Sequence, residues 1–129
     1  MAISKKTKNE IIVLFIVILP IFFILASQQK VDIIFFMNPG CRISNQSSTV
    51  IEEIKEEFGE KVNIREIRVN MYLNDPQDSE EIKILREKYR VYGVPTIIIN
   101  GKEFTAQYTK DNIEEEICKK FIIRPKVCK

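Results

Sequence analysis

The stretch VDIIFFMNPGCRIS, residues 31–44, decides how this chain folds. Its first seven residues are apolar except for Asp32, and such a short apolar run predicts a strand that is buried on both faces. Asn38-Pro39-Gly40 contains the residue types that break strands. The next residue, Cys41, opens a pattern that is typical of a helix and extends to Phe58. The stretch therefore predicts a strand, a loop and a helix, with a cysteine where the helix begins.

The rest of the chain continues this alternation of strands and helices. Within 41–58, the apolar residues Val50, Ile51, Ile54 and Phe58 form one helical stripe, and Gly59 is placed to end the helix. Asn100-Gly101 between apolar runs predicts a tight hairpin. The further expected elements are a strand from Val62 to Val69, a turn at Asn74-Asp75-Pro76, a helix from Asp78 to Tyr89, strands within 92–99 and 102–105, and a helix from Lys110 to Phe121 capped by Thr109. The order β-α-β-α-β-β-α predicts an α/β fold whose four-stranded mixed sheet is flanked by helices.

The N-terminal segment predicts a membrane-spanning helix. Residues 11–26 are sixteen apolar residues without a charge, and Lys5, Lys6 and Lys8 precede them. Because basic flanks stay in the cytoplasm, we expect a single-pass membrane protein with its N-terminus cytoplasmic and its body outside the cell. A cleaved signal peptide and a secreted body are the alternative, although Ile24 is bulky where a cleavage site favours a small residue. The expected domains are an anchor segment with a short linker, 1–30, and a single soluble domain, 31–129.

Composition excludes several classes of function. The 129 residues carry a net charge of +2, and the body at 31–129 is nearly neutral, so we expect no nucleic acid partner. The chain has no His, which excludes Ser-His-Asp and Cys-His nucleophile pairs and any metal site that needs a His ligand. We therefore expect neither a metal nor a cofactor. The three cysteines remain as the distinctive chemistry.

Two stretches together resemble the thioredoxin superfamily, over essentially all of residues 31–129. One is the strand, loop and helix around Cys41, and the other is Gly93-Val94-Pro95-Thr96 leading into a hairpin. The second stretch resembles the cis-proline loop of that family. The resemblance implies a thioredoxin-like fold and a cis Val94–Pro95 bond that faces the cysteine. It also implies that Val94, Pro95 and Thr96 bind an extended substrate peptide. A simple strand break at Pro95 is the alternative interpretation.

The chemistry expected at Cys41 is that of a nucleophilic thiolate. Unpaired amides and the helix dipole stabilise a thiolate at a helix start, and Arg42 adds positive charge. Thioredoxin-like oxidoreductases carry Cys-x-x-Cys, whereas this motif is Cys41-Arg42-Ile43-Ser44. Ser44 cannot resolve a mixed disulfide, but its hydroxyl can lower the thiol pKa by donating a hydrogen bond. Such Cys-x-x-Ser sites resemble monothiol members, which need an external thiol. Alternatively, Cys41 is a small buried apolar residue.

A second alignment of the motif is possible. If Cys41 matched the second cysteine of the family motif, Asn38 would replace the nucleophile and Asp32 would match a buried acid beneath the site. The downstream spacing of the helical stripe and of the strand at Val62 favours the first-cysteine alignment. In that alignment the position of the buried acid is occupied by Phe35, which cannot relay a proton.

The other two cysteines are expected to form a structural disulfide. The last helix begins at the site and runs away from it, which places Cys118 about 12 Å along its axis and out of reach of Cys41. A tail that turns back at Pro125 sets Cys128 beside the last helical turn, and an oxidising exterior would keep a Cys118–Cys128 bond. Two free buried thiols are the alternative.

Two functions from different classes follow. The first is a membrane-anchored monothiol thiol-disulfide oxidoreductase or isomerase, whose partners are exported cysteine-containing proteins or a membrane redox partner, with an external thiol as reductant. The second is a non-catalytic thioredoxin-fold binding module at the membrane surface. Glutathione-supported iron–sulfur binding, as in monothiol glutaredoxins, fits an outward-facing body poorly.

The expected topology gives the first testable prediction. Protease added to intact cells should remove the body, because it lies outside, while the membrane fraction keeps the N-terminal segment. Immunodetection of the two parts measures this outcome. A mature protein that begins at Ser27 in the soluble fraction would contradict the retained anchor.

Overall fold

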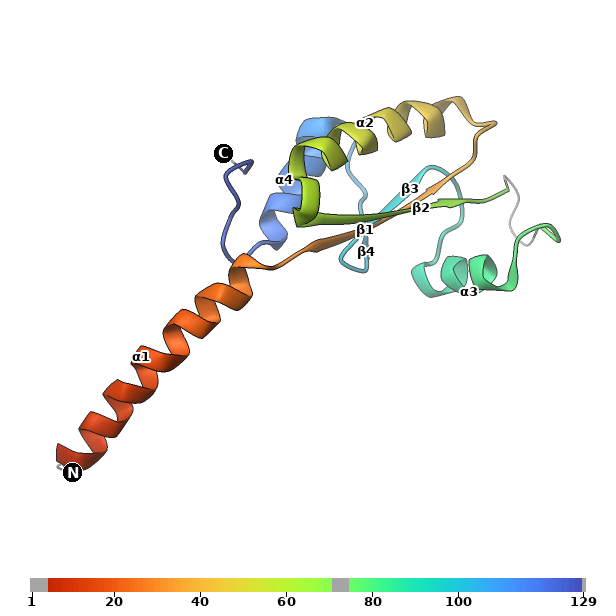
Figure 1. The fold of residues 1–129 in the computed structure, drawn as a ribbon. Coiled ribbons are helices and arrows are strands. Elements are labelled where there is room, and N and C mark those ends of the chain that lie inside the picture. The colour runs from red at the N-terminus through yellow and green to blue at the C-terminus, as the bar shows by residue number, and fades with distance from the viewer. Residues whose placement is uncertain (1–4, 71–74, 129) are drawn as a thin grey trace.

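The computed structural model describes residues 5–70 and 75–128. Its elements in chain order are α1 (Lys5–Ser27), β1 (Val31–Met37), α2 (Arg42–Phe58), the 3-10 helix η1 (Gly59–Lys61), β2 (Val62–Arg68), α3 (Glu80–Tyr89), β3 (Thr96–Ile99), β4 (Lys102–Glu103) and α4 (Lys110–Lys120). Figure 1 shows this arrangement, with α1 projecting from one end of the α/β domain. Asn74 of the expected turn, and residues 1–4 and 129 of the expected domains, lie outside the described residues.

The sheet has the predicted mixed topology, in the order β2-β1-β3-β4. β1 pairs in parallel with β2, and Val31 lies opposite Val62. It pairs antiparallel with β3, and Phe36 lies opposite Thr96. The β3–β4 hairpin turns through Asn100 and Gly101, which both have positive φ, as a tight turn requires. β1 is therefore an inner strand with a hydrogen-bonded partner on each side.

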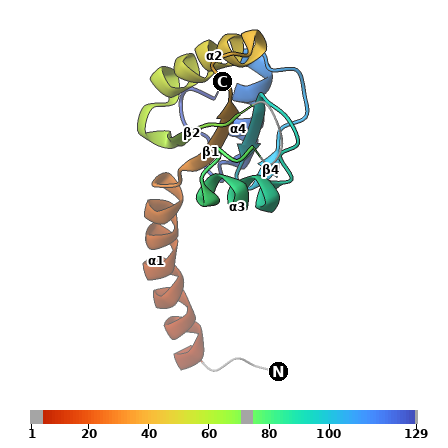
Figure 2. The same ribbon diagram turned by 90° about the vertical axis from the view of Figure 1, so that its right-hand side faces the viewer.

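Helices cover both faces of the sheet, which confirms the expected α/β fold. α2 and α4 pack together on one face and α3 lies on the other (Figure 2). The alternation of β1 divides its side chains between two cores: Ile33 and Phe35 join the α2–α4 side, and Phe36 joins the α3 side. All three side chains are fully buried. The prediction of a strand buried on both faces is thus confirmed, with Asp32 as the exposed exception.

The predicted stripe on α2 is present. Ile51, Ile54 and Phe58 are buried against the sheet, while the four glutamates between 52 and 57 are exposed. Gly59 ends the helix with a φ of 52°, and its amide donates to the carbonyl of Lys55. Its glycine identity is needed because side chains rarely adopt this conformation. The chain then forms one short 3-10 turn, which the sequence pattern did not indicate.

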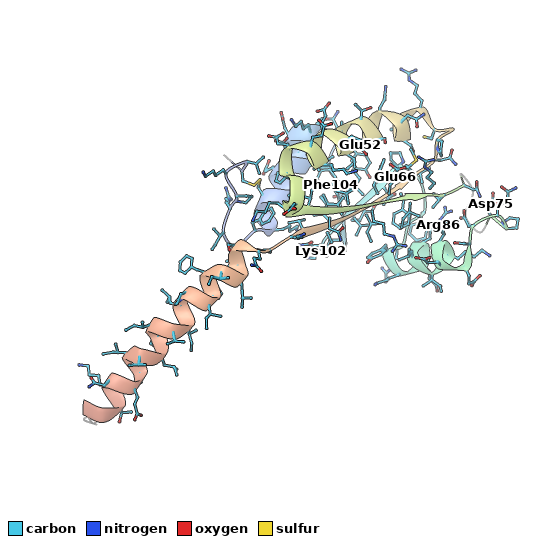
Figure 3. The ribbon with its side chains drawn as sticks, in the orientation of Figure 1. Glu52, Glu66, Asp75, Arg86, Lys102 and Phe104 are labelled. Carbon is cyan, nitrogen blue, oxygen red and sulfur yellow. A yellow bond between two sulfur atoms is a disulfide. The ribbon has the colours of Figure 1, made fainter. Side chains whose placement is uncertain are left out.

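The second helix of the domain begins later than expected. α3 starts at Glu80, and Ser79 caps it by accepting a hydrogen bond from the amide of Ile82. Asp78 is instead buried, and its Oδ2 lies 2.7 Å from Nη1 of Arg86. Asp78 Oδ1 also accepts a hydrogen bond from the amide of Asn70, at 3.2 Å. Figure 3 labels Arg86, the partner of Asp78, on α3. The boundary was missed because Asp78 serves this buried ion pair rather than the helix.

The hairpin return is also shorter than expected. β4 ends at Glu103, whereas the sequence predicted a strand to Thr105. The amide of Phe104 still donates to the carbonyl of Ile97, at 2.8 Å, and its ring is buried in the core on the α2–α4 side. Because the ring of Phe104 is buried in the core, the chain leaves the strand direction there and continues as the loop that leads to α4.

The N-terminal helix α1 is longer than the apolar run that predicted it. Its 23 residues span about 35 Å at 1.5 Å per residue. Among the described residues it is the one helix long and apolar enough to cross a membrane, a test that a signal sequence also passes. Pro20 lies inside it. The helix exceeds the apolar run because the polar residues before Ile11 continue it.

The linker after α1 is held against the domain rather than free. The Gln29 amide group donates to the carbonyl of Lys120 at 2.7 Å and accepts from the amide of Ile122 at 2.9 Å. Lys61 Nζ donates to the carbonyl of Ser27 at 2.6 Å. Because the last carbonyls of a helix lack partners within it, Gln29 also completes the end of α4.

The predicted disulfide is present. Cys118 in α4 is bonded to Cys128 in the tail, with their Cα atoms 5.7 Å apart. Both residues and Val127 pack against the core on the α2–α4 side. A link across so short a loop contributes on the order of 2–3 kcal/mol to stability by the chain-entropy model, and it fixes the end of the chain.

The buried ion pair gives a prediction about stability. Replacing Arg86 with Met should destabilise the fold by about 3–5 kcal/mol, because the Asp78 carboxylate loses its buried partner. Chemical denaturation of the full chain in detergent micelles measures the loss. Lys83→Met is the control, because Lys83 lies 3.7 Å from Glu80 in an exposed pair that contributes about 0–1 kcal/mol. Equal effects of the two changes would contradict the role given to the Asp78–Arg86 pair.

Candidate functional site

Cys41 is the N-cap residue of α2. Its backbone is extended, with φ −96° and ψ 118°, and its carbonyl accepts the first helical hydrogen bond, from the amide of Asn45, at 3.1 Å. The side chain is half-buried, and it is the free cysteine among the described residues. The β1–α2 loop that carries it lies at the end of the domain away from α1 (Figure 1). The structure therefore places a free thiol at a helix start, on the pole opposite α1.

Asn38 holds the loop that presents the thiol. Its side-chain amide donates to the carbonyl of Val69 at 2.7 Å, and its Oδ1 accepts from the amide of Gly40 at 2.7 Å. Its own carbonyl accepts from the amide of Cys41 at 2.9 Å. A Cβ at Gly40 would lie 3.0 Å from Asn38 Oδ1, so the tight approach favours glycine there. Asn38 thus holds the loop in place, a role that the sequence pattern did not indicate.

The local groups favour the thiolate. The pKa of the Cys41 thiol lies below its ordinary value, because the backbone amide and the hydroxyl of Ser44 donate to the sulfur. Desolvation of the sulfur opposes this lowering, whereas a hydrogen bond from the amide of Ile43 lowers the pKa further. No acidic residue lies in the first turn of α2 to oppose the negative charge. The first turn of this helix can therefore stabilise an attacking sulfur.

Ser44 and Arg42 differ in how they contact the site. Ser44 is fully buried, and its Oγ accepts from the amide of Asn38 at 3.3 Å, so the hydroxyl links the loop to the thiol. Arg42 is exposed, and the groups that lower the pKa of Cys41 are Ser44 and Ile43. The expectation that Arg42 influences the pKa of the Cys41 thiol stays a prediction.

The observed geometry bears on the alternative alignment of the motif. Asp32, which that alignment made a buried acid beneath the site, is exposed, and its carbonyl accepts from the amide of Asn100 in the hairpin. Asn38 precedes the helix by a full turn of loop, whereas Cys41 begins it. Phe35 is fully buried and apolar. These positions favour the first-cysteine alignment.

The loop before β3 has the predicted conformation, with a cis peptide bond between Val94 and Pro95. Both residues are half-buried. Thr96 is buried, and its hydroxyl donates to the carbonyl of Gly93 at 2.8 Å. The Thr96 side chain is therefore engaged within the protein, which leaves Val94 and Pro95 as the more accessible part of the expected peptide site.

A groove of about 630 Å³ runs beside Pro95. Its walls come from α2, from Pro95 and from the loop after β4, and the residues are Ile43, Gln46, Ser47, Val50, Pro95, Glu103, Phe104, Thr105, Ala106, Gln107 and Tyr108. Tyr108 fastens the two loops together, because its hydroxyl donates to the carbonyl of Pro95 at 3.2 Å and its ring stacks on Phe104. Burial raises the pKa of Tyr108, so the phenol keeps the proton that it donates. No local sequence pattern indicates this wall, because its members lie far apart along the chain.

The remaining cysteines do not complete the site. Cys118 and Cys128 are bonded to each other, so neither offers a thiol to Cys41 while that bond persists. The predicted site residues thus form two groups: Cys41, Arg42 and Ser44 in the motif, and Val94, Pro95 and Thr96 in the loop before β3. Cys41 and Ser44 contact each other, and Ile43 of the same turn shares a groove with Pro95.

Comparison with known proteins identifies solved structures that share this fold. The sequence matches no protein-family model and no curated protein at a significant level. Solved structures do match. Thioredoxin-2, described as a component of malaria parasite protein secretion machinery, matches with a TM-score of 0.52 and 19% identity, covering 70% of this chain and 82% of that chain. The germline-specific thioredoxin Deadhead of Drosophila melanogaster matches with a TM-score of 0.52 and 16% identity, over 75% of this chain and 87% of that chain. A malarial protein matches with a TM-score of 0.51 and 17% identity, over 74% of this chain and all of that chain.

The chain has a thioredoxin-like fold. Within the thioredoxin-like fold of this chain, the β1–α2 loop and the loop before β3 meet at one end of the sheet, because Phe36 is paired with Thr96. The first carries the thiol and the second carries the cis proline. Both loops therefore border the same end of the domain.

The hydrogen bonds to the sulfur predict how its reactivity depends on pH. Alkylation of Cys41 should reach half of its maximal rate below the ordinary thiol pKa of about 8.5, because only the thiolate reacts. Ser44→Ala should move this midpoint to higher pH, because it removes one donor and keeps the backbone amide. Ser48→Ala, the same change one turn further along α2, should leave it in place. A midpoint that is unchanged in Ser44→Ala would contradict the role of the hydroxyl.

Proposed function

We propose that this protein is a membrane-anchored, outward-facing monothiol thiol-disulfide oxidoreductase or isomerase that acts on exported proteins through Cys41. The observation that carries the proposal is the free thiol at the N-cap of α2, with its pKa lowered by Ser44, on a thioredoxin-like fold. The cis Val94–Pro95 bond at the same end of the sheet supports it. Thiol-disulfide exchange is the chemistry that these parts together can perform.

The first step is attack on a substrate disulfide. The Cys41 thiolate attacks one sulfur of that bond, forms a mixed disulfide with it, and displaces the other sulfur as a thiolate that takes up a proton. The backbone of Val94 and Pro95 is the expected support for the extended substrate chain. Ile43 is exposed within the same motif and lines the groove next to Pro95, so it offers apolar contact to a peptide.

The second step needs a thiol from outside the motif. Ser44 has no sulfur with which to attack the mixed disulfide, and Cys118 and Cys128 are bonded to each other. A second cysteine of the substrate releases Cys41 with no net oxidation, which is isomerisation. Two molecules of an external small thiol instead release it with net reduction of the substrate, and they are themselves oxidised to a disulfide.

The position of α1 relative to the thiol is compatible with a site that acts on proteins outside the membrane. α1 and the thiol lie at opposite ends of β1, whose seven residues span about 23 Å at 3.3 Å per residue. With α1 as the anchor, the thiol faces away from the bilayer. The exported cysteine-containing proteins and the external thiol reductant that we propose as partners would approach from that side, and a membrane redox partner would need to extend to it.

A non-catalytic binding module is the second candidate, and one observation favours it. The groove of about 630 Å³ beside Pro95 is lined by residues of α2 and of the loop after β4, and Cys41 is not among them. A protein that only holds a partner needs such a groove and does not need a resolving thiol. Ser44 in the motif is compatible with that function.

Restoring the missing thiol tests the catalytic proposal. Reduction of a model peptide disulfide should be slow with the native chain and faster when a small thiol is added, because the mixed disulfide has no internal exit. Ser44→Cys should raise turnover several-fold by supplying that exit. Ser48→Cys is the matched control, because it adds a thiol one turn further along α2 and should raise turnover little.

The opposite results would favour the binding module. A Cys41 thiol that titrates at its ordinary value, together with no gain in Ser44→Cys, would rule out the catalytic proposal. Cys41→Ser should also abolish the mixed disulfide with the peptide, which mass spectrometry of the quenched reaction detects. Peptide that stays bound non-covalently to Cys41→Ser would then report on the groove alone.

A further inference from the structure

The pole of the domain from which α1 emerges carries an apolar pair that the proposed chemistry does not use. Among the described residues outside α1, five large apolar side chains are exposed: Ile43, Ile84, Tyr92, Ile122 and Ile123. Ile122 is 67% exposed and Ile123 is 37% exposed. They are consecutive, and they directly follow Phe121, which is buried. Such a pair at the end of α4 contributes little to the core.

This pair lies next to the end of α1. The amide of Ile122 donates to Gln29 Oε1 at 2.9 Å, and Gln29 is the second residue after the helix. The same side chain donates to the carbonyl of Lys120, so the end of α4 is held in place from two sides. Figure 1 shows the C-terminal tail beside the junction of α1 and β1. The exposed pair on the tail therefore lies near the end of α1, where Leu25 is 66% exposed.

Exposed basic residues accompany the pair in the tail and in the linker. Lys30, Arg124 and Lys126 are exposed, and none of them pairs with a carboxylate among the described residues. Lys61 is also at this pole, through its hydrogen bond to the carbonyl of Ser27. Acidic residues are also near the tail, because Arg124 borders a hollow lined by Glu57, Asp111, Glu114 and Glu115, whereas Lys30 and Lys126 are not among its lining residues. Exposed basic residues next to an apolar pair match the headgroups and the acyl boundary of an anionic bilayer.

We propose that the pole formed by Ile122, Ile123, Lys30, Arg124 and Lys126 rests on the surface of an anionic phospholipid bilayer. This inference depends on the anchor in the proposed function, because α1 brings the pole to the bilayer. The two isoleucines enter the interface, and the basic side chains lie at the phosphate groups. The Cys118–Cys128 bond holds the tail in the position that this contact needs.

The absence of Trp from the chain allows a direct test. Three single Trp variants of the full chain, Ile24→Trp, Ile122→Trp and Ile84→Trp, replace isoleucines that are 58%, 67% and 59% exposed. Each is reconstituted in vesicles of phosphatidylglycerol and phosphatidylcholine whose acyl chains are brominated near the headgroup. Quenching of Trp fluorescence then reports contact with the interface. Ile84 lies on α3, so it serves as the matched control for any affinity of Trp itself.

We expect loss of fluorescence at positions 24 and 122, and little loss at 84. Quenching at 24 without quenching at 122 would overturn the surface contact and leave the anchor intact. No quenching at 24 would overturn the anchor, and the surface contact with it. Equal quenching at 84 and 122 would mean non-specific adsorption and would also overturn the inference.

The charge component is tested with the same Ile122→Trp variant. Quenching should fall when phosphatidylcholine replaces all the phosphatidylglycerol, and it should fall in high salt, because screening weakens the attraction of basic groups to phosphate. Quenching that is equal in the two vesicle types would overturn the assignment of an anionic surface as the partner.

Discussion

The enclosure of β1 is the constraint on which the rest of the structure depends. The strand pairs with β2 on one side and β3 on the other, and its alternate side chains enter two separate cores. Its start fixes the emergence of α1, and its end fixes the loop that presents Cys41. A residue shift in this strand would send Phe35 and Phe36 to the wrong cores and displace both ends together.

The thiol environment is built mainly from backbone groups. A helix start offers amides that have no partner within the helix, and Cys41 uses those of Ser44 and Ile43. Such donors are fixed by the fold and cost no further ordering when the thiolate forms. These donors alone can favour the anion, and the position that the resemblance gives to a proton-relaying acid is held by the buried, apolar Phe35.

The features that sequence could predict are those encoded by local patterns. The apolar run of β1, the stripe on α2 and the Asn-Gly hairpin each follow from residues close together in the chain, and the structure contains all three. The pairing of Cys118 with Cys128 followed from their short separation. The cis bond before Pro95 came from the resemblance rather than from any local pattern.

The features that sequence could not predict join residues distant along the chain. The Gln29 bridge to Lys120 spans 91 residues, and the hydroxyl of Tyr108 reaches the carbonyl of Pro95 only because two loops fold together. The start of α3 was missed for a related reason. Asp78 has the composition of a helix cap, but its ion pair with Arg86 depends on burial, which no sequence pattern specifies.

The ties between α1 and the domain have a consequence for reach. Gln29 and Lys61 fasten the helix end to the domain on two sides, so the domain has little freedom to pivot on a loose tether. If α1 crosses a bilayer, the thiol stays at a nearly constant height above the lipid, roughly the length of β1 from the pole where α1 emerges. Disulfides close to the lipid would then lie below the thiol, whereas disulfides in chains that extend outward would reach its height.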